Sequence, residues 1–274
     1  MGNWLAKRFV AGPVVPVLRF SGVIGQAGFG RKGLTLEDMN DAIERAFKVK
    51  KKGAVAIAIN SPGGSPVQSA LIAMRIRALA EEQDVPVYAF CEDVAASGGY
   101  WLACAADHIY AEAASIVGSI GVISAGFGFT ELIAKAGVER RVHTAGESKA
   151  MLDPFSPEDP KDVARLTAIQ EDVHGQFKDW IRERRGARIS GKSEELFDGS
   201  FWTGRKAVEL GLTDGVGNLH GVLREKFGEK VKLQPVKVSR GWLQKRFGVS
   251  QGGEIASDVL ATIEERAVWS RYGL

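Results

Sequence analysis

The sequence of 274 residues has little of what a metal or redox protein needs. It contains only two cysteines, Cys91 and Cys104, and four histidines. The cysteines lie in apolar stretches at no metal-binding or redox spacing, and no histidine belongs to an H-E-x-x-H motif. We therefore expect two small buried thiols and no metal site.

Long apolar runs are also absent. No stretch approaches the roughly 18 uncharged apolar residues of a membrane-spanning helix, and the first residues, MGNWLAKRFVAG, lack the apolar centre of a signal peptide. We expect a protein that is made and kept in the cytoplasm. Two similar segments, Trp4–Phe9 and Trp242–Phe247, place aromatic residues beside a Lys-Arg pair. They leave open a peripheral contact with anionic lipid or simple packing of these segments on the core.

Neither sign of charge is in large excess, since 36 Lys and Arg against 33 Asp and Glu give a net charge of +3. This balance does not indicate the strongly basic surface of a nucleic-acid-binding protein, and we expect no nucleic-acid partner. The one basic cluster, between Arg182 and Lys192, is typical of a solvated helix end. With 45% hydrophobic and 25% charged residues, the composition predicts one large globular domain, with or without an extension.

A serine stands between a predicted strand and a predicted helix. The strand is Val85–Phe90, the helical turns are Tyr100–Ala106, and Ser97 lies between them. Gly98 and Gly99 follow at once, which permits a sharp turn and leaves backbone N–H groups uncovered by side chains. This is the setting of an exposed serine nucleophile, and it is equally the setting of a serine that only caps a helix.

A second strand-to-helix connection has a similar composition. The apolar strand Ala54–Ile59 is followed by NSPGG, and Ser65 and Pro66 then begin a helix predicted to end at Glu82. The N–H of Gly64 and those of the first helical turn point beyond the carboxyl end of the strand. They could bind an oxyanion or a thioester oxygen, or the segment could be an ordinary connection.

A glycine-rich loop imitates a dinucleotide-binding motif. Gly28, Gly30 and Gly33 form G-x-G-x-x-G before a helix predicted over Thr35–Lys52. The glycines do not directly follow a strand, and the next strand ends in Asn60 instead of an acidic ribose ligand. We expect no cofactor, and we interpret the loop as a flexible cover over a binding cleft.

The second half of the chain adds two polar candidates and a long helix. Ser119 lies in a glycine-bounded turn, where its hydroxyl is structural or holds a catalytic group. Lys149 follows a strand predicted over Val138–Thr144, and it is either solvated or partly desolvated by its apolar neighbours, which would favour the uncharged amine. The amphipathic helix Ser156–Arg185 covers the core or a neighbouring subunit. Repeated strand-turn-helix units favour a mainly parallel sheet between helices.

Five motifs occur in one order: NSPGG at Asn60–Gly64, ASGGYW at Ala96–Trp101, GSIGV at Gly118–Val122, GESK to DPF around Lys149, and WTGRKAVELGLTD at Trp202–Asp214. Through them the chain resembles the serine/lysine peptidases of the signal peptide peptidase A family, from about Val14 to Gly217. The resemblance implies an α/β fold, the crotonase-like spiral of ββα units shared with the caseinolytic protease, with a C-terminal helical region. It also suggests an N-terminal tail (1–13), a peptidase domain (14–238) and a C-terminal extension (239–274).

The same resemblance implies a role for five residues. Ser97 is the nucleophile, Lys149 is the general base, and Ser119 orients the lysine. The N–H groups of Gly64 and Gly98 form the oxyanion hole. Whether Ser97 and Lys149 meet within one chain or across subunits stays open.

We therefore expect a homo-oligomeric serine endopeptidase with a Ser/Lys dyad. Its partners would be short hydrophobic peptides, such as signal-peptide remnants, or unfolded protein segments. One alternative is a crotonase-like acyl-CoA enzyme, which needs an acidic catalytic residue that neither NSPGG nor ASGGYW supplies. Another is a non-catalytic assembly protein on a protease fold, which would have a broken dyad.

Overall fold

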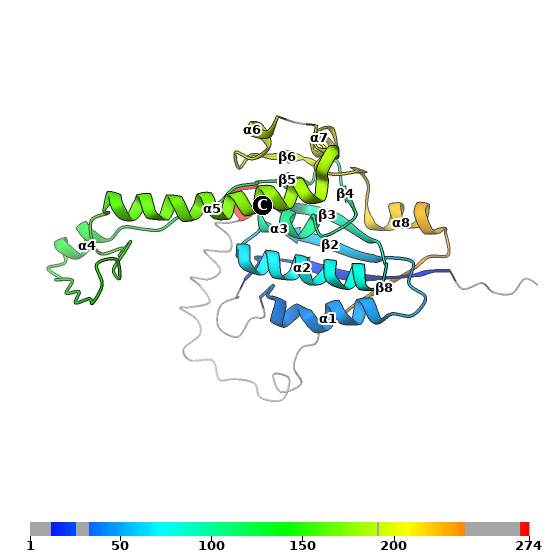
Figure 1. Ribbon diagram of the computed structural model, residues 1–274, viewed down its shortest axis with the longest axis horizontal. Coiled ribbons are helices and arrows are strands. Elements are labelled where there is room, and N and C mark those ends of the chain that lie inside the picture. Colours follow the sequence, from blue (N-terminus) through cyan, green and yellow to red (C-terminus); the bar gives the residue numbers. More distant parts are fainter. Residues whose placement is uncertain (1–11, 26–32, 191, 239–268, 274) are drawn as a thin grey trace, which may run out of the picture.

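The computed structural model describes residues 12–25, 33–190, 192–238 and 269–273. They form an α/β fold with helices on both faces of an eight-stranded sheet (Figure 1). The strands are β1 (Val14–Ser21), β2 (Val55–Ser61), β3 (Val87–Ala96), β4 (His108–Ala111), β5 (Ile116–Gly118), β6 (Phe201–Thr203), β7 (Gly215–Val216) and β8 (Lys232–Pro235). The main order is β6-β5-β3-β2-β1-β8, with β4 beside β3 and β7 beside β4. Among these described strands only β5 and β6 pair antiparallel, which confirms the predicted, mainly parallel sheet.

The helices are α1 (Leu36–Lys48), α2 (Pro66–Glu82), α3 (Gly98–Ala103), α4 (Thr130–Lys135), α5 (Pro160–Arg185), α6 (Ser193–Leu196), α7 (Gly204–Glu209) and α8 (Leu219–Phe227), with a 3-10 turn η1 (Gly186–Arg188) after α5. Helix α2 has its predicted bounds, because Ser65 caps it by accepting a hydrogen bond from the Gln68 amide and Pro66 occupies its first turn. Helix α1 ends at Lys48, earlier than the predicted Lys52.

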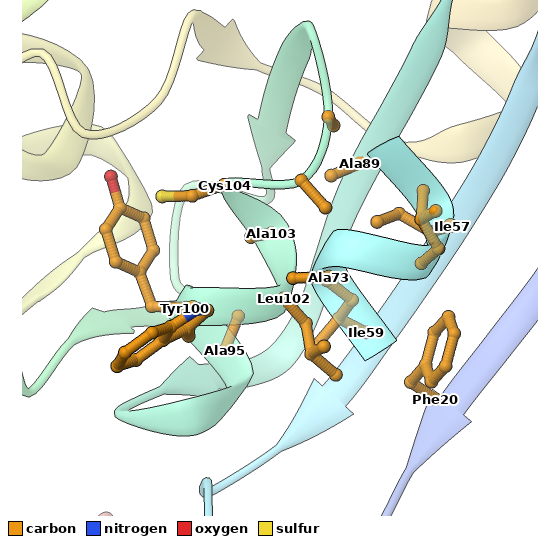
Figure 2. Packing of buried hydrophobic residues seen from close by; sticks show 14 of the residues in the cluster. Phe20, Ile57, Ile59, Ala73, Ala89, Ala95, Tyr100, Leu102, Ala103 and Cys104 are labelled. Carbon is orange, nitrogen blue, oxygen red and sulfur yellow. The ribbon is translucent and has the colours of Figure 1, made fainter. Parts of the chain in front are cut away.

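Alternate residues of the central strands face two separate cores. In β2, Ile57 and Ile59 pack on the side of α1, α2 and α3, whereas Ala56 and Ala58 face α8. Figure 2 shows Ile57 and Ile59 beside Ala73 of α2. A strand that is buried on both faces cannot shift its register without exposing apolar side chains. The carboxyl ends of β2 and β3, and the loops that follow them, are therefore held in fixed positions.

A buried ion pair ties the end of α5 to this body. Arg185 is 2% exposed and donates two hydrogen bonds to the carboxylate of Asp214, at 3.0 and 2.9 Å, and one to the carbonyl oxygen of Gly211 at 2.9 Å. The Ile109 amide donates to the same carboxylate at 2.7 Å. Burial acts to raise the pKa of the Asp214 carboxyl, but the hydrogen bonds from Arg185 and Ile109 outweigh it and hold the pKa below its ordinary value.

Residues 123–170, which we call the arm, project away from the sheet (Figure 1). They include α4 and the first turns of α5, a helix whose buried residues are Phe177, Ile181 and Arg185, all in its second half. The strand predicted over Val138–Thr144 is not formed, because the arm lies away from the sheet and these exposed residues have no strand to pair with. The arm exposes these large apolar side chains: Ile123, Phe127, Leu132, Val138, Val142, Phe155, Val163 and Ile169.

Several expectations fall outside the described residues. They concern most of the glycine-rich loop (26–32) and both Trp-Lys-Arg segments, Trp4–Phe9 and Trp242–Phe247. The three domain bounds stay predictions. Among the described residues, no helix is long and apolar enough to cross a membrane.

We predict that Asp214→Asn lowers the free energy of unfolding by about 3 kcal/mol at neutral pH, because it leaves the buried Arg185 charge without its counterion. The folded-state pKa of Asp214 is depressed, so the carboxylate stabilises the protein fully above the unfolded value of about 3.9. That contribution is lost as the pH falls through the folded value. Urea titrations across this range measure the loss.

Glu209→Gln is the matched control, because it removes an exposed ion pair with Lys206 and should change the free energy far less. Equal losses in the two variants, or a loss for Asp214→Asn that does not shrink at low pH, would contradict this role of the buried pair.

Candidate active site

Ser97 occupies a strained turn between β3 and α3. Its backbone has φ +52° and ψ −123°, a conformation that residues other than glycine rarely adopt. The Ser97 amide donates to the carbonyl oxygen of Gly118 at 2.8 Å, and the Ser97 carbonyl accepts from the amides of Tyr100 and Trp101. The side chain makes no capping hydrogen bond. Ser97 thus stands at the N-cap position of α3 without using its hydroxyl as a cap.

Gly64 and Gly98, the two predicted oxyanion donors, line one pocket with Ser97. A Cβ atom on Gly63 would lie 2.7 Å from the Cβ of Ser97, so the loop after β2 packs directly on the Ser97 turn. A Cβ on Gly98 would lie 3.4 Å from the nitrogen of Gly64, which places the predicted pair of glycines side by side. No backbone acceptor among the described residues takes the N–H of Gly64 or Gly98. Two such donors suit a negatively charged oxygen.

The Ser97 turn borders a small apolar pocket. Its accessible volume is about 20 Å³. Trp101 of α3 and Phe177 of α5 stack with ring centroids 4.7 Å apart and close one side. The pocket has room for a small side chain only. Its lining residues are Gly64, Pro66, Ser97, Gly98, Trp101, Gly121, Val122, Val173 and Phe177.

Ser119 lies one residue after the carbonyl group that holds the Ser97 amide. It is 7% exposed, has φ +52°, and its amide donates to the carbonyl oxygen of Ser200 at 2.7 Å. The structure therefore brings together four of the five predicted site residues: Ser97, Ser119, Gly64 and Gly98.

Lys149 is the exception. It lies on the arm, is exposed, and does not line the pocket at Ser97. Its neighbours Met151 and Leu152 are half-buried, but they do not cover the lysine. A single chain therefore assembles the serine side of the predicted dyad and leaves the lysine in solvent.

The two thiols and His143 do not replace the lysine. Burial raises the pKa of both thiols, Cys91 and Cys104, to about 12, so neither is a thiolate near neutral pH. His143 is exposed on the arm. The described residues contain no group of three His, Cys, Asp or Glu side chains that could hold a metal ion.

Sequence reasoning missed two side chains next to the site. The His174 imidazole lies 3.1 Å from the carbonyl oxygen of Ile120, one residue beyond Ser119. The Tyr272 hydroxyl lies 3.3 Å from the Ser119 hydroxyl. Both residues are far from Ser119 in sequence and belong to no motif, so only the folded chain shows them.

Comparisons with known proteins include one family model and several named proteases. The model of peptidase family S49 matches residues 80–233. The chain is 35% identical over 184 residues to the chloroplastic serine protease SPPA of Arabidopsis thaliana, a match that covers 67% of this chain and 27% of the plant protein. A solved structure of 1510-N, a membrane-bound stomatin-specific protease, shares the fold with a TM-score of 0.50 at 16% identity and covers 84% of this chain and 100% of its own.

A more similar relative has an unexpected name. The chain is 48% identical over 272 residues to a Brucella abortus protein named Na(+)/H(+) antiporter NhaA. That match covers 95% of this chain but only 37% of the Brucella protein. The chain thus spans well under half the length of both of these curated relatives.

The strain at Ser97 is measurable. Ser97→Gly should be more stable than Ser97→Ala by about 1 kcal/mol, because glycine adopts a positive φ without a steric penalty. Guanidinium titrations of the two variants give this difference directly.

The same pair of substitutions at Ser115 provides the control. Ser115 is buried and has no positive φ, so there the glycine variant should be the less stable one. If glycine destabilised both positions equally, the Ser97 turn would not be strained.

Proposed function

The chain belongs to peptidase family S49, and on this basis we propose that it is a serine endopeptidase with Ser97 as nucleophile and Lys149 as general base. One observation carries the proposal: the Ser97 hydroxyl makes no capping hydrogen bond, and Ser97 lines one pocket with Gly64 and Gly98, whose N–H groups lack a backbone acceptor among the described residues. A helix cap needs the opposite arrangement, with the hydroxyl engaged.

The proposed reaction is an acyl transfer to Ser97 followed by hydrolysis of the acyl-enzyme. The neutral Lys149 amine takes the proton from Ser97 Oγ as this oxygen forms a bond to the peptide carbonyl carbon. The carbonyl oxygen becomes negative and is held by the N–H groups of Gly64 and Gly98, each worth about 3 kcal/mol. When the C–N bond breaks, the lysine returns the proton to the leaving amine, and water then hydrolyses the acyl-enzyme.

We further propose that the lysine acts across a subunit interface. In one chain Lys149 is exposed on the arm and does not reach the pocket of Ser97. The arm also exposes apolar side chains, with Phe127 at 81% and Leu132 at 62%, which favours its burial against a second copy. A homo-oligomer would place the arm of one subunit over the Ser97 pocket of its neighbour, where Ser119 could orient the incoming amine.

Short hydrophobic peptides are the proposed substrates, including signal-peptide remnants and unfolded segments. The pocket of about 20 Å³ suits a small apolar side chain next to the scissile bond.

Neither alternative function gains support from the site. An acyl-CoA enzyme of the crotonase type needs a catalytic carboxylate, and none of the described residues that line the Ser97 pocket carries one. A non-catalytic assembly protein would not need to maintain a strained serine near two amides that lack a backbone acceptor in the described part of the chain.

A mixing experiment tests the function and the interface together. Ser97→Ala and Lys149→Ala should each abolish hydrolysis of a short apolar peptide, because the two residues act as one unit. An equal mixture, after subunit exchange, should regain about a quarter of the wild-type activity, since random assembly joins an intact serine to an intact neighbouring lysine at that frequency.

Lys135→Ala is the control, because Lys135 is another exposed lysine of the arm and its loss should leave activity intact. Activity in the Lys149→Ala protein would remove the lysine from the mechanism. A mixture that exchanges subunits but stays inactive would show that the dyad does not form across chains.

A further inference from the structure

The chain enters and leaves the arm through two segments that lie side by side. Residues 119–122, which we call the entry segment, lead from β5 into the arm. The chain returns to the body through the second half of α5, which lies beside α3 (Figure 1). Both segments line the same small pocket, the entry segment through Gly121 and Val122 and α5 through Val173 and Phe177. The distance between the two segments therefore sets the width of this pocket.

A hydrogen bond joins the two segments. The His174 imidazole of α5 lies 3.1 Å from the carbonyl oxygen of Ile120. A carbonyl oxygen only accepts, so the imidazole donates through its Nε2–H group. Ile120 is fully buried, and its carbonyl has no backbone donor among the described residues. His174 thus satisfies a buried acceptor that would be costly to leave without a partner.

His174 lies directly after the part of α5 that belongs to the arm. Counted from the arm, it is the first α5 side chain that hydrogen-bonds to the body in the described part of the chain. Further along the helix, the Trp180 indole donates to the Trp101 carbonyl oxygen at 3.1 Å, and Arg185 pairs with Asp214. These later contacts fix the helix on the body, so His174 holds the entry segment against a fixed support.

The loop before β6 contacts the entry segment independently of α5. The Ser119 amide donates to the Ser200 carbonyl oxygen at 2.7 Å, and a Cβ atom on Gly121 would lie only 3.1 Å from the Cα of Gly199. Loss of the His174 hydrogen bond would leave these contacts in place. The entry segment would then stay attached to the body but could move away from α5.

We propose that His174 is a positioning residue that sets which side chains the Ser97 pocket accepts. This inference rests on the proposed function, in which the pocket receives the side chain next to the scissile bond. His174 does not itself line the pocket, so it acts through Ile120 and not on the substrate. With the bond intact, the pocket of about 20 Å³ excludes large side chains. Without it, the wall formed by the entry segment moves outward and a larger apolar side chain gains access.

Two substitutions separate the hydrogen bond from the bulk of the side chain. His174→Leu keeps a similar volume and removes the donor, whereas His174→Gln keeps an N–H donor at the end of the side chain. The measured quantity is kcat/KM for two peptides that differ only in leucine or alanine before the scissile bond. The leucine-to-alanine ratio should rise about tenfold in His174→Leu and stay close to the wild-type ratio in His174→Gln.

Gln176→Leu is the matched control, because Gln176 is an exposed residue of the same helix whose side chain donates to Asp172 of α5. It should leave the ratio unchanged. Both peptides are measured on one protein sample, so a smaller folded fraction lowers both values equally and cancels in the ratio. A ratio that His174→Leu does not change, or that His174→Gln changes equally, would overturn the role of His174.

A binding test separates this role from the catalytic function. In the Ser97→Ala protein, added His174→Leu should tighten the binding of the fluorescein-labelled leucine peptide about tenfold in fluorescence anisotropy and leave that of the alanine peptide nearly unchanged. This change in binding, without hydrolysis by the wild-type protein, would support the role of His174 and contradict the proposed peptidase function. Hydrolysis by the wild-type protein, with no change in peptide preference in His174→Leu, would overturn the role of His174 alone.

Discussion

The close packing of two backbone turns at Ser97 is the constraint on which the site depends. The loop after β2 approaches so closely that a side chain on Gly63 would collide with the Cβ of Ser97. The approach is possible because β2 and β3 are parallel neighbours whose carboxyl ends meet at one edge of the sheet. This approach places the amides of Gly64 and Gly98 close together. The hydrogen bond from the Ser97 amide to the Gly118 carbonyl brings the end of β5, and with it Ser119, to the same site.

The remaining architecture divides the chain into a rigid body and an arm. The body is fixed by a sheet that is buried on both faces and by the Arg185–Asp214 pair, which holds the second half of α5. The first half of α5 continues into the arm, where apolar side chains and Lys149 are exposed. A helix of 26 residues, about 39 Å long, that buries residues only in its second half indicates a missing partner surface. In the proposed function that surface is the next subunit.

Features that depend on neighbouring residues could be predicted from the sequence better than features that depend on contacts between residues far apart in the chain. Helix α2 was predictable because its cap and its first proline are local signals. Strand β3 was predicted to end at Phe90 because Glu92 and Asp93 are charged, yet it continues to Ala96, where Asp93 accepts a hydrogen bond from Asn60 of the neighbouring strand. A strand was predicted over Val138–Thr144, but strand pairing depends on neighbours that the described part of the arm lacks. The positions of Lys149 and Tyr272 depend on how the chain folds back, and no local pattern contains that information.

The central claim is that the strained Ser97 is a nucleophile, and covalent labelling tests it most directly. The wild-type protein should react with a fluorophosphonate to give one adduct, which mass spectrometry maps to the peptide that contains Ser97, and the Ser97→Ala protein should give none. An adduct on a different serine, or no adduct at Ser97 in a correctly folded oligomer, would contradict the account.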